Sequence, residues 1–435
     1  MMKRKTGLCF FPAFDWAISK THPEREERLL YTYDQLKEEG VFNLENIIEY
    51  NPIEIDKKEI IRTHIMVPDV DSNITESHLI AVGGAIALAD ALMKKEINNG
   101  FALIRPPGHH SFKVVYGNRG FCNINNEAIV VDYLRSKYKV KKIAIIDTDC
   151  HHGDGTQDIF WYDPDILCIS MHQDGRTLYP GTGFIDECGD GHGTGYTLNF
   201  PLPPSTGEDG FLLTLREGIM PIISEFKPDI IINSAGQDNH YTDPITNMRF
   251  SAQGYAKLTE ILNPDLAVLE GGYSIEGALP YVNLGILLAL AGIDYSTIKE
   301  PDYSREKVSD KKEYLDYIKE VIDKVHRIWK NRGNIDKSKI NNGFISRSKK
   351  VFYDTEYITD TQYESLKLCD NCSGFITIDS KCRDKGYHIF AITIPFDACS
   401  TCEKEAYDLY NKKNNEYDIV YLQDKKNDKF YNKKF

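Results

Sequence analysis

The sequence predicts an α/β fold with a mainly parallel β-sheet and helices on both of its faces. Between residues 75 and 295, short apolar runs alternate with longer segments of helical period, and each run is followed by Gly, Asp or His. Uninterrupted β-branched runs are typical of strands covered on both faces. Helical segments between such strands favour a parallel sheet. The expected strands are 141–147, 166–171, 229–235 and 266–272, and the expected helices are 75–95, 126–136, 208–226, 252–262 and 277–291.

A change in composition after residue 300 predicts a second domain, as the length of 435 residues also suggests. A charged segment of helical period at 311–330 closes the first domain, which we place at residues 1–332. The polar, basic segment 333–350 is expected to be a linker. Residues 351–435 are then expected to form a small β-rich module of the zinc-ribbon kind, with a Lys- and Asn-rich tail from residue 403 onward.

Charge and apolar patterning exclude several classes of protein. Lys and Arg number 52 against 65 Asp and Glu, and the net charge of −13 disfavours general binding to DNA or to an anionic membrane. The longest apolar run, 278–293, is interrupted by Pro280 and Gly285, so we expect a buried helix and not a membrane span. No secretory signal is recognisable. We therefore expect a cytoplasmic protein without a membrane partner.

Polar residues at the ends of two expected strands form a candidate metal site. Asp149 and His151 are two residues apart after strand 141–147, so their side chains can point the same way. Asp238 follows strand 229–235, and the carboxyl ends of neighbouring parallel strands meet at one edge. One imidazole and two carboxylates match a catalytic Zn²⁺ site that keeps an open position. Taken alone, an Asp-x-His pair is more often a cap or a local hydrogen bond.

Two further motifs follow other strand-like segments. His109 and His110 lie on a loop stiffened by Pro and Gly after the strand-like segment 101–105, where a positioned histidine pair can take up and return a proton. Tyr273 directly follows the two glycines that end strand 266–272, a place where its hydroxyl can polarise a carbonyl. Taken separately, each motif has an ordinary explanation. A histidine pair is more often an accident of a polar loop, and a tyrosine after two glycines is more often packed in a turn.

Taken together, these motifs resemble those of the histone deacetylase family, which has an arginase-like fold. The form of two motifs, at 22–25 and 270–273, is closer to the class II and prokaryotic branches than to class I. An arginase-type binuclear enzyme would need an Asp-x-His-x-Asp run, which 147–151 lacks. The segments that carry the resemblance are 105–110, 120–123, 147–155, 179–183, 193–196, 234–244 and 270–273.

The resemblance implies a role for each residue of the site. It assigns His110 as main general base and acid, oriented by Asp154, and His109 as its electrostatic partner, paired with Asp147. Tyr273 would donate a hydrogen bond to the acyl oxygen. The other implied groups are Asp149, His151 and Asp238 for catalytic Zn²⁺; Phe121, Tyr179, Gly120 and Pro244 for the substrate channel; and Asp147, Asp149, His151, Ser170 and Met171 for a K⁺ ion.

The implied activity is hydrolysis of the amide of N-ε-acetyl-lysine, or of a related acyl-lysine, in proteins by a metal-activated water. The alternative within the same class is an acetylpolyamine or other small-molecule amidohydrolase, for which Asp69, Asp71 and Glu76 are candidate rim acids. A different class is a non-catalytic binding module. It is disfavoured because all the implied catalytic groups are present.

Two CxxC pairs, Cys369/Cys372 and Cys399/Cys402, are separated by 26 residues. Four thiolates close a tetrahedron and leave no open position, so the sequence predicts a structural Zn²⁺ site. A redox CxxC is the alternative, but no βαβ pattern surrounds either pair. Zinc ribbons often bind protein or nucleic acid, and the basic segment 333–350 is compatible with such a partner.

Overall fold

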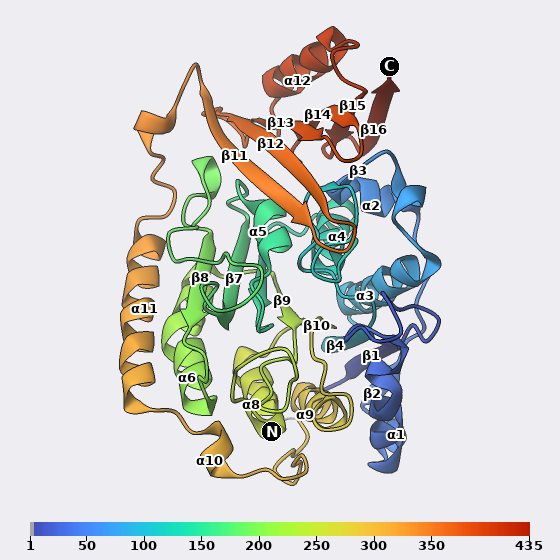
Figure 1. Ribbon diagram of the computed structural model, residues 1–435, viewed down its shortest axis with the longest axis vertical. Coiled ribbons are helices and arrows are strands. Elements are labelled where there is room, and N and C mark those ends of the chain that lie inside the picture. The colour runs from blue at the N-terminus through green and yellow to red at the C-terminus, as the bar shows by residue number, and fades with distance from the viewer. Residues whose placement is uncertain (1–3) are drawn as a thin grey trace.

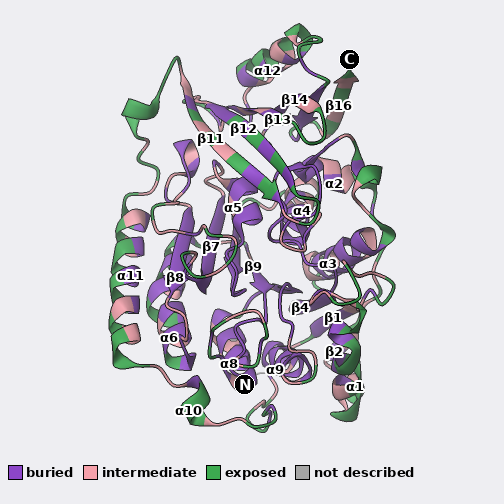
Figure 2. Ribbon diagram, in the orientation of Figure 1, coloured by how far each residue is buried: buried purple, intermediate pink, exposed green. Residues whose placement is uncertain are grey.

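The computed structural model describes residues 4–435 and contains the expected α/β domain. Eight strands form one sheet in which every neighbouring pair is parallel. Figure 1 shows helices packed around this sheet, and Figure 2 shows its central strands buried. In sheet order the strands are β2 (Ile47–Glu49), β1 (Thr6–Phe11), β4 (Asn99–Ile104), β10 (Leu266–Leu269), β9 (Ile230–Ala235), β6 (Ile143–Asp147), β7 (Ile166–Gln173) and β8 (Thr197–Leu202).

Helices cover both faces of the sheet, as expected. Alternate residues of β6 belong to different cores: Ala144 and Ile146 face one cluster, and Ile143 and Ile145 face the other. The first cluster includes α1 (Leu30–Glu38), α6 (Glu208–Leu213), α7 (Met220–Phe226), α8 (Ala252–Leu262), α9 (Leu279–Ala291) and α11 (Lys312–Lys330). The second includes α2 (Lys57–Thr63), α3 (Glu76–Met93), α4 (Asn126–Tyr133) and α5 (Asp154–Phe160). The short strand pair β3 (Ile65–Met66) and β5 (Val114–Val115) adds Met66 and Val115 to the second cluster, and α10 (Arg305–Val308) contributes to neither.

Side-chain caps set the ends of several helices. Asn125 accepts a hydrogen bond from the backbone N–H of Ala128 at the start of α4 (2.9 Å), and Ser251 caps α8 in the same way. Within residues 4–435, α3 alone is long and apolar enough to cross a membrane, but 67% of it is buried inside the fold. Its apolar character therefore reflects packing against β1 and β4.

The C-terminal domain is larger and more ordered than the expected small module. Its six strands form one sheet, antiparallel except for the β14–β15 pair, and α12 connects those two strands. β11 occupies residues 344–350 of the predicted linker, and the predicted tail from 403 onward contains most of α12 and two strands. The elements are β11 (Phe344–Tyr353), β12 (Ile358–Lys367), β13 (Phe375–Cys382), β14 (Tyr387–Ile394), α12 (Ser400–Lys412), β15 (Ile419–Asp424) and β16 (Lys429–Lys434).

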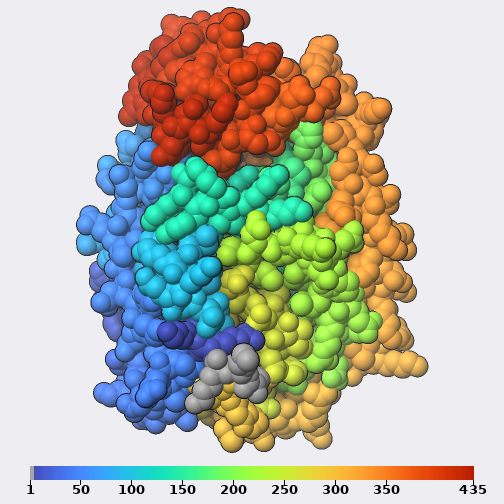
Figure 3. Space-filling view, turned by 180° about the vertical axis from the view of Figure 1, so that it is seen from behind, coloured from blue at the N-terminus to red at the C-terminus, as the bar shows by residue number. Residues whose placement is uncertain are grey.

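Buried charge explains why β11 resembled a linker. Arg347 and Lys349 both form ion pairs with Asp158 of α5, and Arg347 also pairs with Glu364 of β12. These basic residues thus face a protein interface and not solvent. The same interface contains an apolar cluster that joins Val114 of β5 to residues of five C-terminal strands. The C-terminal domain (orange to red in Figure 3) is therefore packed firmly against the first domain.

Candidate active site

A pocket of about 580 Å³ opens at the carboxyl ends of the central strands of the large sheet. Ligands bind at this edge in parallel α/β sheets because the loops after several strands converge there. The lining is mostly apolar, with four histidines among its residues. It consists of Ile18, His22, Pro107, His109, His110, Gly120, Phe121, His151, Leu178, Tyr179, Ile245, Gly271 and Tyr273, together with Asp354, Thr355 and Tyr357 of the C-terminal domain.

The three predicted metal ligands meet beside this pocket. One ligand atom from each of Asp149, His151 and Asp238 lies within 4.8 Å of the other two, and all three residues are buried. Nδ1 of His151 lies 3.1 Å from Oδ1 of Asp149 and 2.8 Å from Oδ2 of Asp238. Two buried carboxylates that converge on one point require a positive partner. An O, O, N donor set open to a pocket fits Zn²⁺ with a remaining open position.

Two His–Asp pairs lie beside the ligands. Nδ1 of His110 lies 2.9 Å from Asp154, and Nδ1 of His109 lies 2.9 Å from Asp147. Asp154 also accepts a hydrogen bond from Arg119, which the sequence analysis did not single out. Each carboxylate orients its imidazole so that Nε2 is directed away from it. The predicted pairing of both histidines is present in the structure.

The two histidines differ in electrostatic environment. Burial opposes charge on His109, but the carboxylates of Asp147 and Asp149 outweigh it and raise its pKa well above the ordinary histidine value. Burial lowers the pKa of His110 well below that value, and positive charge on His109 and Arg119 adds to the effect. His110 is therefore the neutral imidazole of the pair, the form that can accept a proton.

Tyr273 lines the pocket and is held from behind by an ion cluster that the sequence analysis missed. The Arg28 guanidinium lies 4.9 Å from the centre of the Tyr273 ring and donates to the carbonyl of Gly272 (2.7 Å). Glu24 accepts from both Arg28 and Arg105, and all three side chains are fully buried. Burial raises the pKa of Tyr273 well above its usual value, which keeps the phenol protonated as a donor. The i, i+4 spacing of Glu24 and Arg28 is the sequence feature that could have indicated this ion cluster.

Three of the four predicted channel residues line the pocket. Phe121 packs edge-on against Tyr273 (5.7 Å between ring centroids), Tyr179 packs against His110 (5.2 Å), and Gly120 also lines the pocket. Pro244 is exposed and is not among the lining residues, so its predicted place in the channel is wrong. Its neighbour Ile245, in the same bend of the loop, lines the pocket instead.

The predicted K⁺ site stays a prediction. The register of β6 and β7 places Asp147 opposite Ser170, and Met171 is the next residue along β7. Of the candidate rim acids, Asp69, Asp71 and Glu76 are exposed and none lines the pocket.

Comparison with known proteins relates this site to one family. The histone deacetylase domain model matches residues 68–283. A probable deacetylase of Archaeoglobus fulgidus is 46% identical over 359 residues, covering 75% of this chain and 99% of its own length. The chain belongs to the histone deacetylase family. AcuC, the acetoin utilization protein of Bacillus subtilis, is 30% identical over 67% of this chain and 83% of its own length. The crystal structure of the HDA15 HD domain matches with a TM-score of 0.65 at 28% identity, covering 75% of this chain and 96% of that domain.

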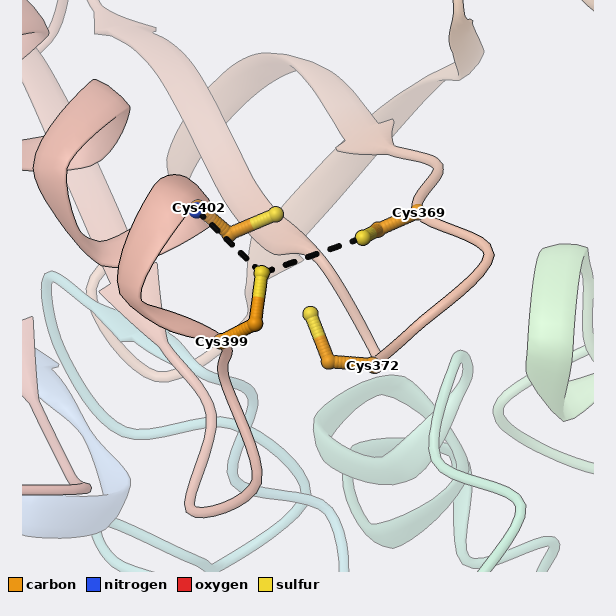
Figure 4. A group of neighbouring side chains, drawn as sticks. All are labelled: Cys369, Cys372, Cys399 and Cys402. Carbon is orange, nitrogen blue, oxygen red and sulfur yellow. Dashed lines mark hydrogen bonds between the residues drawn. The ribbon is translucent and has the colours of Figure 1, made fainter.

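Outside this site, the four cysteines of the two CxxC motifs converge at one end of the C-terminal sheet. All four are free thiols. Figure 4 shows the sulfur atoms of Cys369, Cys372, Cys399 and Cys402 directed toward one another. All four lie within 4.8 Å of each other, and those of Cys369 and Cys399 are 3.9 Å apart. Zn–S bonds of about 2.3 Å in a tetrahedron place sulfur atoms about 3.8 Å apart. Both predicted CxxC pairs thus contribute to one cluster that fits a closed tetrahedral metal site.

Proposed function

We propose that this histone deacetylase family member is a zinc-dependent deacetylase that hydrolyses N-ε-acetyl-lysine, or a related acyl-lysine, in proteins. The observation that carries the proposal is the buried Asp149–His151–Asp238 cluster beside the His110–Asp154 pair. When bound, zinc supplies Lewis acidity and activates water for attack on the amide. The aromatic rings of Phe121 and Tyr179 suit an apolar aliphatic stem of the length of a lysine side chain.

The protein side chains handle the protons of the reaction. His110, neutral before the reaction, takes a proton as water adds to the acyl carbon, and Asp154 stabilises the resulting imidazolium. His109 stays charged beside Asp147 and favours the negative charge that develops on the acyl oxygen. The Tyr273 hydroxyl donates to that same oxygen. His110 then returns its proton to the departing amine, so that amide and water become a carboxylic acid and an amine, which at neutral pH are present as carboxylate and ammonium.

Replacing Tyr273 with phenylalanine is expected to lower kcat on an acetyl-lysine peptide about 100-fold with little change in KM. The variant loses one donor to the developing oxyanion, and one such donor contributes roughly 100- to 1,000-fold. The ring keeps its packing against Phe121 and Arg28. Release of free amine by zinc-loaded protein measures the effect. Tyr295→Phe, which removes a hydroxyl bonded to Glu260 outside the pocket, is the matched control and should keep full activity. Full activity in Tyr273→Phe would refute the role of the phenol.

An acylated polyamine or other small amine is the second candidate substrate. One observation favours it: the carboxylate of Asp354 lines the pocket, although the acids considered from sequence do not. A comparison of kcat/KM for acetylspermidine and for an acetyl-lysine peptide separates the two candidates. A preference of at least tenfold for the peptide supports the protein substrate, and the reverse preference supports the small amine.

We further propose that the Cys369–Cys372–Cys399–Cys402 cluster holds a structural zinc ion. Its four donors leave no position for substrate. The cluster also joins the loop after β12 to the start of α12, so a bound ion would connect these two segments. A protein or nucleic-acid partner for this domain stays a prediction.

Replacing Cys372 with serine is expected to remove one zinc ion per chain and to destabilise the C-terminal domain by ~3 kcal/mol or more, because metal binding at such sites contributes directly to folding. Zinc content by atomic absorption and thermal unfolding with and without chelator measure both effects. Cys382→Ser is the control, since Cys382 is also buried in this domain but lies outside the cluster. Equal zinc content in wild type and Cys372→Ser would overturn the assignment.

A further inference from the structure

We propose that the C-terminal domain forms part of the active-site rim, and that Asp354 selects acyl amides that carry a positive charge close to the acylated amine. This inference rests on the proposed function and adds a substrate class to it. The tip of the β11–β12 hairpin contributes Asp354, Thr355 and Tyr357 to the pocket that contains His110 and Tyr273. Figure 1 shows this hairpin (orange) reaching from the C-terminal sheet over the first domain. These residues lie outside the segment 68–283 that matches the family model.

The hairpin tip is bonded to the loop that forms one wall of the pocket. The Asp354 carboxylate accepts hydrogen bonds from the Tyr179 hydroxyl (2.7 Å) and from the Gly120 backbone N–H (3.1 Å). Glu356 accepts from the backbone N–H of Asn118 (3.0 Å), and Thr355 donates to the Asn118 side chain (2.7 Å). Asp354 is therefore held against two channel residues and is not free to turn into solvent.

The domain interface fixes the hairpin as a whole. The Tyr353 hydroxyl donates to the carbonyl of Val114 (2.7 Å), and the hydroxyls of Tyr116 and Ser380 are hydrogen-bonded at 2.8 Å. Arg347 binds Asp158 of α5 at 2.8 Å. Contacts along β11, at the neighbouring β13 and at the tip thus hold the hairpin in one position, so the rim is preorganised before substrate arrives.

Asp354 supplies the negative charge of this rim. It is the one Asp or Glu among the residues that line the pocket, and the described lining contains no Lys or Arg. A carboxylate has about four acceptor positions, and the bonds from Tyr179 and Gly120 use two of them. Asp354 is half-buried and lines the same pocket as Tyr357, whose side chain is 80% exposed, so a substrate that enters the pocket can reach the carboxylate. An ammonium or guanidinium group next to the acylated amine would satisfy it.

The test compares two acetyl-lysine peptides that differ only in the neighbouring residue, arginine in one and glutamine in the other. In wild type, kcat/KM is expected to be roughly five- to tenfold higher for the arginine peptide, mainly through KM, as for a partly exposed charge pair. Asp354→Asn keeps an acceptor for Tyr179 and Gly120 but removes the charge. It should bring the ratio to about one, and the ratio within each protein corrects for any effect of the substitution that both peptides share. Raised salt should also lower the wild-type ratio.

Asp408→Asn is the matched control, since it changes the net charge equally at an exposed position of α12. It should leave the wild-type ratio unchanged. A ratio in Asp354→Asn equal to that of wild type, or an equal loss on both peptides, would overturn the assignment. Calorimetric Kd values of both peptides provide a second readout. If wild type cleaves neither peptide, the proposed function fails. The shift in the Kd ratio between wild type and Asp354→Asn then still decides whether Asp354 selects positive charge.

Discussion

Replacing Asp238 with alanine is expected to lower kcat/KM on an acetyl-lysine peptide at least about 1,000-fold. The variant removes one of three converging donors, and the activation of water and substrate by a bound metal contributes several kcal/mol to the rate. Asp238 also accepts a hydrogen bond from the backbone N–H of Cys150 (2.7 Å), which holds together the two loops that carry the ligands. Metal content and turnover, measured on the same preparation, test the expectation.

The control for Asp238→Ala is Asp310→Ala. Asp310 also accepts backbone hydrogen bonds, from Gly207 and Gly210, but lies away from the pocket. The Asp310→Ala variant should be less stable than wild type but keep the wild-type turnover per folded molecule. More than a tenth of wild-type activity in folded Asp238→Ala would show that this carboxylate is not part of the reacting centre.

Replacing His110 with alanine is expected to lower kcat roughly 100- to 10,000-fold, the usual contribution of general acid–base catalysis. The zinc content should stay at the wild-type value, because His110 is not among the three converging ligands. In wild type, the lowered pKa of His110 places the acid limb of kcat/KM below pH 6.5, since the base works only when unprotonated. Activity should therefore fall as the pH drops through that lowered pKa.

His326→Ala, at a histidine bonded to the Gly218 carbonyl outside the pocket, is the control for His110→Ala and should remain active. A folded His110→Ala protein with at least a third of wild-type kcat would assign the proton transfers to another group. An acid limb above pH 7 would contradict the neutral state of His110 inferred from its burial and its positive neighbours.

The site was predictable from sequence because its main parts follow strand ends. Asp149 and His151 come directly after β6, and Asp238 follows β9, its neighbour in the sheet. Once the apolar runs predict a parallel sheet, those loops must meet at one edge. Cys369 and its three partners were predictable for a similar reason, since the CxxC spacing alone limits the ligand geometry.

Contacts between segments far apart in the chain could not be predicted in this way. Arg347 and Lys349 gave β11 the composition of a linker, because nothing in the local pattern shows that Asp158, about 190 residues earlier, neutralises them. The placement of Asp354 beside Tyr179 depends on the same docking of the two domains. The prediction that Pro244 lines the channel failed for a smaller reason. A motif gives the position of a loop, but not which of two adjacent side chains faces the pocket.

Anomalous X-ray diffraction at the zinc edge tests the central claim most directly. Crystals of the zinc-loaded protein should show one anomalous peak within bonding distance, about 2.0–2.2 Å, of Asp149, His151 and Asp238. A second peak should lie among Cys369, Cys372, Cys399 and Cys402. If the crystals showed only the peak among the cysteines and the same zinc-loaded protein still turned over substrate at the full rate, the account would be contradicted.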